Sequence, residues 1–235
     1  MEMHKALVAI VLAGGFGTRL KNKLKEIPKP MIPIHGKPFL EYVFNQLIRN
    51  NISTVIMSIY YKGEIIIKKY GNSYNGLEII YSKDKAALGT GGAVRKAVKK
   101  ANYDNVFIIN GDTFFDINFN ELMENHINNN NDLTLSLKRM NNFNRYGYVK
   151  TNQDGEIKYF EEKKFQSTGK IDGGIYIIKK ELFKYKRLNN FFLLTDYIKS
   201  QLQKQKIGSV TFNNPFIDIG IPEDLKKAEF LLKHY

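Results

Sequence analysis

The feature that most constrains the fold is a short, continuously apolar run over residues 6–12 that stops at a glycine-rich turn. A run of this length without polar alternation is typical of a strand buried on both faces of a parallel sheet. Gly14, Gly15 and Gly17 follow it. Glycines after a buried strand let the backbone turn sharply and approach a ligand, and several N–H groups then point at one spot. This stretch therefore predicts a cradle for phosphate oxygens.

Two positive charges, Arg19 and Lys29, follow the predicted cradle. Together with the glycines they indicate a nucleoside triphosphate site; the alternative is a turn that is glycine-rich only for tightness. Two better-known phosphate loops do not fit. A dinucleotide fingerprint requires glycine where Leu20 stands, and a Walker-type loop requires Ser or Thr after Gly-Lys, where this chain has Pro38.

Size and composition predict one soluble domain. The chain has 235 residues, of which 43% are hydrophobic, and we expect the domain to span 1–235. Apolar runs stay well short of the roughly 18 residues that cross a membrane, and residues 1–5 lead straight into the first strand without room for a signal peptide. We therefore expect a cytoplasmic protein with no membrane partner. The sequence has no cysteine, and its four histidines are dispersed along the chain: His4, His35, His126 and His234. We therefore expect no zinc site and expect these histidines at the surface.

The formal net charge of +13 raises the question of nucleic-acid binding. The basic residues do not support that function, because most are lysines scattered along the chain in what we interpret as solvated faces. A basic balance also suits a protein whose substrates carry phosphate. We expect no nucleic-acid partner.

Alternating strands and helices in the first half predict a doubly wound, mostly parallel α/β sheet. The apolar stripe after Pro38 recurs every three to four residues and predicts a helix. The other elements expected in this half are strands over 53–59, 77–81 and 105–110 and helices over 62–70 and 91–101.

The second half is predicted to be a smaller, β-rich part. Asp154-Gly155 is typical of a hairpin turn. We see no linker between residues 1–112 and 113–235 and no internal repeat in the chain. The elements expected here are strands over 133–137, 148–151, 157–160 and 171–178 and helices over 119–127, 194–203 and 222–232.

A candidate metal ligand follows the last strand of the first half, in Asn110-Gly111-Asp112. Open α/β sheets bind ligands beyond the carboxyl ends of their strands, so we expect Asp112 on the same rim as the phosphate cradle. An oxygen-preferring Mg²⁺ held by one or two carboxylates and substrate phosphates is the natural occupant. An ordinary Gly-Asp turn is the alternative.

Residues 12–20, Leu-Ala-Gly-Gly-Phe-Gly-Thr-Arg-Leu, with Pro-Lys-Pro-Met at 28–31, resemble the signature of the sugar-1-phosphate nucleotidylyltransferases. The resemblance implies a Rossmann-like nucleotidyltransferase fold with a nucleotide-binding half, 1–112, and a sugar-binding half, 113–235. It also implies that a sugar 1-phosphate attacks the α-phosphate of a nucleoside triphosphate and releases pyrophosphate. The stretch 216–225, Phe-Ile-Asp-Ile-Gly-Ile-Pro-Glu-Asp-Leu, resembles the closing motif of that family, and Leu-Gly-Thr-Gly-Gly-Ala at 88–93 resembles its nucleobase loop. Close helix packing is the other explanation of the glycines at 88–93.

The resemblance assigns roles to individual residues. Arg19 would stabilise the leaving pyrophosphate and Lys29 the α-phosphate or sugar phosphate. Asp112 and Asp218 would hold Mg²⁺; a helix-capping role is the alternative for Asp218. The residues expected to bind the nucleotide are Leu12, Ala13, Gly14, Gly15, Gly17, Thr18, Gly89, Thr90 and Gly111.

Sugar-side motifs of the family resemble three stretches of the second half, which implies sugar contacts by Gly147, Glu162, Lys163 and Asp172. This chain departs from the family pattern at two places. Lys164 stands where proline usually follows the Glu-Lys pair, and Asp172 replaces the usual asparagine. An aspartate can accept hydrogen bonds from sugar hydroxyls but lacks the amide donors.

Within the family, the compact length and the loop at 88–93 are most similar to guanylyltransferases that act on D-glycero-α-D-manno-heptose 1-phosphate. GTP and this heptose phosphate are therefore the expected substrates, for the synthesis of capsule, lipopolysaccharide or surface-layer glycans. Uridylyl-, cytidylyl- or thymidylyltransfer to a hexose 1-phosphate remains an alternative, as does a non-catalytic nucleotide-sugar sensor. A homo-oligomer is a further expectation.

Overall fold

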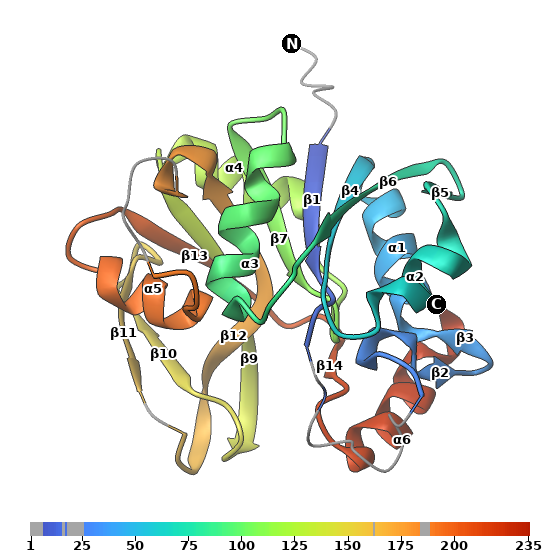
Figure 1. Ribbon diagram of the computed structural model, residues 1–235. Coiled ribbons are helices and arrows are strands. Elements are labelled where there is room, and N and C mark those ends of the chain that lie inside the picture. The colour runs from blue at the N-terminus through green and yellow to red at the C-terminus, as the bar shows by residue number, and fades with distance from the viewer. Residues whose placement is uncertain (1–6, 16, 18–25, 162, 184–188) are drawn as a thin grey trace.

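A computed structural model describes residues 7–15, 17, 26–161, 163–183 and 189–235. The parallel core of its main sheet has four neighbouring strands in the spatial order β7, β1, β4, β6 (Figure 1). Their bounds are Leu7–Leu12 for β1, Ile52–Ile59 for β4, Leu77–Lys83 for β6 and Asn105–Asn110 for β7. The short β5, Ser73–Tyr74, pairs antiparallel with β6 at the edge. The mostly parallel sheet predicted for the first half is thus present.

Helices cover both faces of the sheet, because neighbouring residues of β1 point to opposite sides. Ala9 and Val11 belong to one core cluster, with α1, α2, α4 and α6, whereas Val8 and Ile10 belong to the other, with α3 and α5. The helix bounds are Phe39–Arg49 for α1, Gly63–Tyr70 for α2, Gly89–Ala97 for α3, Phe119–Asn128 for α4, Leu194–Gln201 for α5 and Pro222–Leu231 for α6. Both faces of the central strands are therefore buried under helices, as their continuous apolar sequence requires.

The second half continues the same sheet in mainly antiparallel form, because β12 pairs antiparallel with β7. β12 also pairs with β9 and β10, β10 pairs with β11, and β13 runs parallel to β9 at the far edge. The bounds are Leu133–Phe143 for β9, Tyr148–Thr151 for β10, Ile157–Glu161 for β11, Gln166–Lys179 for β12 and Ile207–Phe212 for β13. The long β9–β12 pair extends beyond the parallel core (Figure 1).

Smaller elements complete the chain. A two-stranded sheet pairs β8 with β14, and another pairs β2 with β3. Their bounds are Pro33–Ile34 for β2, Lys37–Pro38 for β3, Thr113–Phe115 for β8 and Phe216–Asp218 for β14, and the 3-10 helices are η2 Lys29–Met31, η3 Val98–Lys100, η4 Lys180–Phe183 and η5 Leu232–His234. In the described part of the chain, no helix has the length and apolar character needed to cross a membrane.

The expected α/β fold class is confirmed, but the expectation that all histidines lie at the surface is wrong. His126 is 1% exposed on α4. Its ring nitrogens lie 2.8 Å from Thr134 Oγ1 and 3.2 Å from Asn105 Oδ1. Burial, with a further contribution from Lys179, lowers the pKa of His126 to about 4. The helical stripe of α4 turns this residue toward the sheet, and the polar neighbours satisfy the buried ring.

Candidate active site

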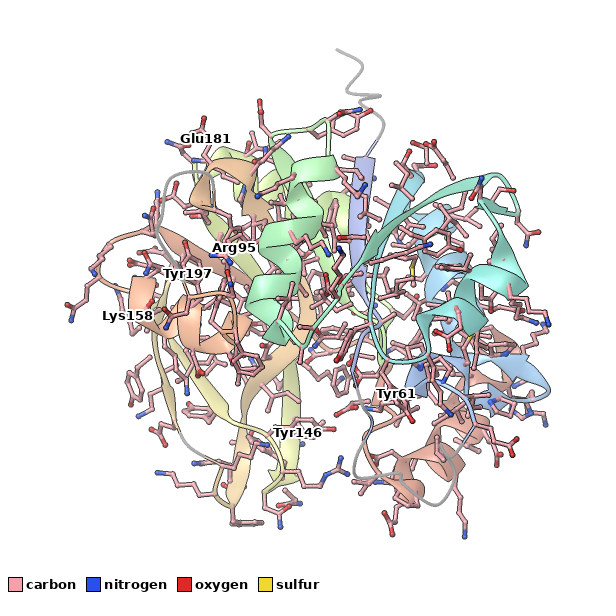
Figure 2. All side chains as sticks on the ribbon, in the orientation of Figure 1. Tyr61, Arg95, Tyr146, Lys158, Glu181 and Tyr197 are labelled. Carbon is pink, nitrogen blue, oxygen red and sulfur yellow. The ribbon has the colours of Figure 1, made fainter. Side chains whose placement is uncertain are left out.

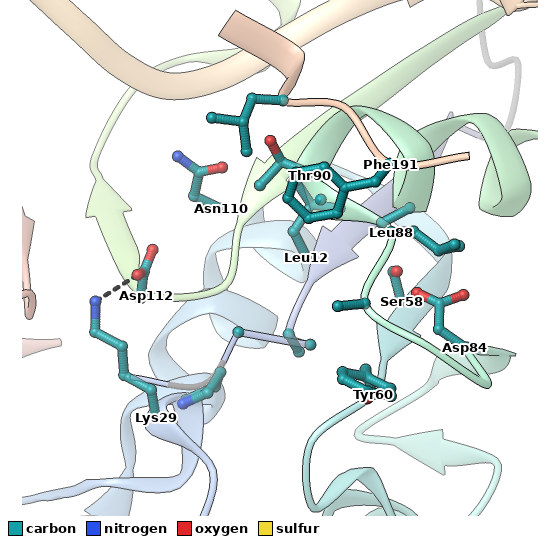
Figure 3. A pocket seen from close by; sticks show the side chains of 18 residues that line it. Leu12, Lys29, Ser58, Tyr60, Asp84, Leu88, Thr90, Asn110, Asp112 and Phe191 are labelled. Carbon is teal, nitrogen blue, oxygen red and sulfur yellow. Dashed lines mark hydrogen bonds and ion pairs between the residues drawn. The ribbon is translucent and has the colours of Figure 1, made fainter. Parts of the chain in front are cut away.

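A pocket of about 340 Å³ opens at the carboxyl ends of the parallel strands. This is where an open α/β sheet offers a crevice for ligands, because loops leave neighbouring strands in different directions. Figure 3 shows the side chains around it. The lining residues are Leu12, Ala13, Gly14, Gly15, Lys29, Pro30, Ser58, Tyr60, Asp84, Ala87, Leu88, Gly89, Thr90, Ala93, Asn110, Asp112, Phe191 and Leu193.

The loop after β1 forms one wall of the pocket and is held against its neighbours by backbone hydrogen bonds. The N–H of Ala13 donates to the carbonyl of Ser58 over 2.8 Å, and the N–H of Gly111 donates to the carbonyl of Leu12 over 3.0 Å. A Cβ on Gly111 would lie 2.7 Å from that carbonyl oxygen, so this position requires glycine for close approach. A Cβ on Gly15, by contrast, would meet no described atom within 4 Å. Gly15 thus leaves its backbone open toward the pocket.

Three charged side chains meet at one end of the pocket. Lys29, in η2, is 7% exposed, and its Nζ contacts Asp112 Oδ2 and lies 3.7 Å from Asp218 Oδ1 (Figure 3 shows the contact with Asp112). The aspartates come from distant parts of the chain and are joined by the β8–β14 ladder, in which Asp218 stands opposite Thr113. The N–H of Ile219 also donates to the carbonyl of Asp112 over 3.0 Å. The two predicted metal ligands, Asp112 and Asp218, therefore both lie within 4 Å of the Lys29 ammonium.

The two carboxylates have the chemistry that a magnesium site requires. Mg²⁺ prefers oxygen ligands and is commonly held by one or two carboxylates together with substrate phosphates. Asp112 and Asp218 share one cation, the Lys29 ammonium, so their charges converge on a common point. Among the described residues, no group of three or more His, Cys, Asp or Glu side chains is arranged to hold a metal. The donor set fits a metal completed by phosphate oxygens rather than a site built from protein ligands alone.

The glycine loop at the start of α3 packs closely against residues 190–193. The N–H groups of Gly91 and Gly92 point to the carbonyl of Phe192 at 3.0 and 3.3 Å. A Cβ on Gly89 would lie 2.4 Å from that carbonyl oxygen, and one on Gly92 would lie 2.4 Å from the carbonyl oxygen of Asn190. Packing therefore accounts for these glycines. Gly89 and Thr90 nevertheless also line the pocket.

The described sugar-side candidates lie outside the pocket lining. A Cβ on Gly147 would come 3.0 Å from the carbonyl oxygen of Glu161, and Lys163 is exposed. Asp172 accepts hydrogen bonds from the N–H of Gly174 over 2.9 Å and from the hydroxyl of Tyr176 over 2.7 Å. Burial raises the pKa of the Asp172 carboxyl above its ordinary value, while these two hydrogen bonds act in the opposite direction.

The remaining predictions divide into two groups. Thr18, Arg19 and Glu162 lie outside the described residues, and Gly17, which has a φ of 59°, does not line the pocket. Sequence reasoning also missed pocket residues at or just after the ends of β4, β6 and β7 and within 189–193. The position of β4, β6 and β7 could have identified Tyr60, Asp84 and Asn110, but nothing in the sequence pattern indicated Phe191.

Comparison with known proteins places this site in a family. The sequence matches the Nucleotidyl transferase family over residues 8–233. It is 44% identical to a D-glycero-alpha-D-manno-heptose 1-phosphate guanylyltransferase from Aneurinibacillus thermoaerophilus, over 97% of this chain and 99% of the relative. A protein of the same name from Campylobacter jejuni subsp. jejuni is 42% identical, over 92% of this chain and 96% of the relative.

The crystal structure of HddC from Yersinia pseudotuberculosis complexed with GMP-PN is similar to this fold, with a TM-score of 0.85 and 32% sequence identity. The match covers 95% of this chain and 98% of that chain. The family match at residues 8–233 includes the glycine loop, Lys29 and both aspartates. The chain therefore belongs to the nucleotidyl transferase family.

Proposed function

We propose that this protein transfers GMP from GTP to D-glycero-α-D-manno-heptose 1-phosphate and releases pyrophosphate. The observation that carries the proposal is the joining of the glycine-lined pocket to the Lys29–Asp112–Asp218 cluster. The names of the relatives from Aneurinibacillus thermoaerophilus and Campylobacter jejuni support these substrates. We also propose that the enzyme works in the cytoplasm and supplies a nucleotide sugar for surface glycans.

The reaction requires positioning and charge neutralisation more than covalent participation by the protein. An oxygen of the sugar phosphate attacks the α-phosphorus in line, and the bond from that phosphorus to the bridging oxygen of pyrophosphate breaks. Lys29 moves from its carboxylate partners to a phosphate oxygen, and Arg19 stabilises the β- and γ-phosphates. Mg²⁺, held by Asp112 and Asp218, would neutralise phosphate charge when bound.

Asp84 supplies a physical reason for a preference for guanine. Its side chain is 4% exposed, it lines the pocket at the end of β6, and its Oδ1 lies 3.0 Å from Lys96 Nζ. In Figure 3 it lies across the pocket from the Lys29–Asp112 pair. Guanine presents two adjacent donors, N1–H and the exocyclic amine, to which one carboxylate can bind. Adenine and cytosine present an acceptor beside their amine, so the same carboxylate would repel that edge.

The guanine assignment is tested by Asp84→Asn. Because hydrogen bonds to a charged group contribute about 1.5–3 kcal/mol, we expect kcat/KM for GTP to fall by roughly 10- to 100-fold. The value for UTP should change by less than threefold. An equal loss for both nucleotides would contradict a role in reading guanine.

The sugar is proposed to contact Gly147, Glu162, Lys163 and Asp172. Each oxygen of Asp172 has a second lone pair beyond those used by Gly174 and Tyr176, so the carboxylate retains capacity for a sugar hydroxyl. Asp172→Asn should then lower the ratio of heptose to hexose turnover. An unchanged ratio would make Asp172 a structural residue only.

The overall function is tested by initial rates of pyrophosphate release with GTP, ATP, UTP and CTP, each combined with the heptose 1-phosphate, mannose 1-phosphate or glucose 1-phosphate. GTP with the heptose phosphate should be the fastest pair by more than tenfold. A faster reaction with a hexose phosphate would refute the sugar, and a faster reaction with UTP or CTP would refute the nucleotide.

A further inference from the structure

A short segment, residues 189–193, is fixed over the glycine loop by hydrogen bonds from both sides. Besides receiving the N–H groups of Gly91 and Gly92, Phe192 donates its own N–H to the carbonyl of Leu88 over 3.1 Å. The N–H of Leu194 donates to Thr90 Oγ1 over 2.9 Å. These bonds tie the backbone of the segment to the wall of the pocket.

Phe192 anchors this segment against the neighbouring helices. The guanidinium carbon of Arg95 lies 5.6 Å from the centre of its ring, and the ring of Tyr197 lies 5.9 Å away. Figure 2 shows Arg95 and Tyr197 close together, from α3 and α5. Arg95 also donates to Asn190 Oδ1 over 3.3 Å. With Phe192 packed against the helices, its neighbour Phe191 points the other way.

Phe191 has a large apolar surface that faces the pocket. It is 59% exposed and lines the cavity, and Figure 3 shows its ring between the Asn110–Asp112 end and the Leu88–Asp84 end. Other exposed phenylalanines, such as Phe230 at 87%, are not among the lining residues. An aromatic ring in this position offers a flat apolar face on which a heteroaromatic base can stack.

Resting on the proposed function, we propose that Phe191 is a stacking platform for the nucleobase of the triphosphate substrate. Stacking of a base on an aromatic side chain tolerates every base but gains most from a purine, which offers the larger face. Phe191 thus adds affinity for the nucleoside, whereas the edge of the base is read elsewhere. The close packing of Gly89, Gly91 and Gly92 serves to bring this ring to the pocket.

The test compares the binding of GTP, GMP and inorganic tripolyphosphate to the full chain by calorimetry. Phe191→Ala should weaken GTP and GMP binding by roughly tenfold to a hundredfold and leave tripolyphosphate binding within twofold. Phe191→Tyr should keep GTP affinity within threefold. Phe191→Leu, which keeps apolar bulk but loses the ring, should lose at least fivefold. Phe230→Ala is the matched control and should change nothing.

Three outcomes would overturn the platform: unchanged GTP affinity in Phe191→Ala, an equal loss for tripolyphosphate, or full retention of affinity in Phe191→Leu. The same measurements with UTP separate this inference from the proposed function. If the parent protein prefers UTP, guanylyl transfer fails, but a selective loss of UTP affinity in Phe191→Ala still supports the platform. If the parent prefers GTP and Phe191→Ala binds it normally, only the platform fails.

Discussion

At the scale of single residues, the Lys29 ammonium can have one role in the ligand-free site and another in the substrate-bound site. Two carboxylates that face one point repel each other, and Lys29 compensates this repulsion in the ligand-free protein. A metal ion held by the two aspartates would neutralise their charge, and substrate phosphates would then attract the Lys29 ammonium. The same lysine can therefore stabilise the empty site and serve the filled one.

His126 predicts how stability depends on pH. Its pKa is lowered from 6.5 to about 4, so between these values the unfolded chain binds a proton that the folded protein excludes. Stability from the neutral ring is fully present above pH 6.5 and falls as the pH drops toward 4. Between pH 7 and pH 5 we expect a loss on the order of 2 kcal/mol from this residue. Urea unfolding at both values should show it.

The control for this prediction is His126→Gln, which removes the titrating group but keeps a polar side chain. The decrease in unfolding free energy between pH 7 and pH 5 should be smaller in the variant by about the same 2 kcal/mol. Parallel pH profiles for parent and variant would show that His126 does not titrate as its burial requires.

Asp172 predicts a loss of stability that is independent of any sugar contact. Asparagine cannot accept through its NH₂ group, so in Asp172→Asn either the Gly174 N–H or the Tyr176 hydroxyl loses its acceptor. We expect the unfolding free energy to fall by about 1–3 kcal/mol. Asp154→Asn, in an exposed turn, is the control. A change below about 0.5 kcal/mol in Asp172→Asn, within the range of ordinary surface substitutions, would contradict these hydrogen bonds.

At the scale of elements, the glycines around the pocket serve two different purposes. Gly111 allows the end of β7 to approach the end of β1, whereas Gly15 leaves backbone open to the pocket. Gly111→Ala should therefore lower the unfolding free energy by about 2 kcal/mol or more, because the new Cβ meets backbone that cannot move easily. Gly15→Ala should leave stability within about 0.5 kcal/mol and weaken triphosphate binding.

Thermal unfolding and calorimetric titration with GTP distinguish the two glycines. The opposite pattern, with Gly15→Ala unstable and Gly111→Ala stable, would mean that the loop after β1 is packed differently. Equal triphosphate affinity in Gly15→Ala and the parent would remove this residue from the phosphate cradle.

Elements with a strong period were predictable from the sequence, and elements defined by distant pairing were not. The buried apolar run at 105–110 predicted β7 with correct bounds, the β segment predicted at 148–151 matches β10, and the stripe after Pro38 predicted α1. β13 was missed, and β9 and β12 extend well past their predicted ends. The first part of β12, Gln-Ser-Thr-Gly-Lys, lacks an apolar alternation, and its pairing with residues 139–143 is a tertiary contact that no local pattern reveals.

The same division holds for the site. Asp112 was predictable because it follows a buried strand, and Asp218 because a motif resembled one from a known family. That Lys29 would lie between them follows only from the three-dimensional arrangement of η2 and the β8–β14 ladder. Phe191 was not predictable, because its role depends on hydrogen bonds between segments about a hundred residues apart in the chain.

At the scale of the whole molecule, the main sheet runs through both halves of the chain, because β12 of the second half pairs with β7 of the first. Within the second half, the guanidinium of Arg145 lies 2.7 Å from the buried carboxylate of Asp224 on α6. Tyr146 lies beside this ion pair, in the second half of the chain (Figure 2). Asp112 is the last residue of the first half and directly precedes β8, whereas Asp218 ends β14 of the second half and stands opposite Thr113. The proposed metal site therefore takes one aspartate from each half of the chain.

The central claim is that the two aspartates hold the charge-neutralising centre of a nucleotidyl transfer, and Asp112→Asn tests it most directly. Pyrophosphate release from GTP and the heptose 1-phosphate is measured at saturating Mg²⁺ for the parent, for Asp112→Asn and for Asp116→Asn as the nearby control. Loss of a principal electrostatic stabiliser should lower kcat by roughly two decades or more, with the melting temperature within about 3 °C and the control at parental rate. Turnover by Asp112→Asn within threefold of the parent would contradict the account.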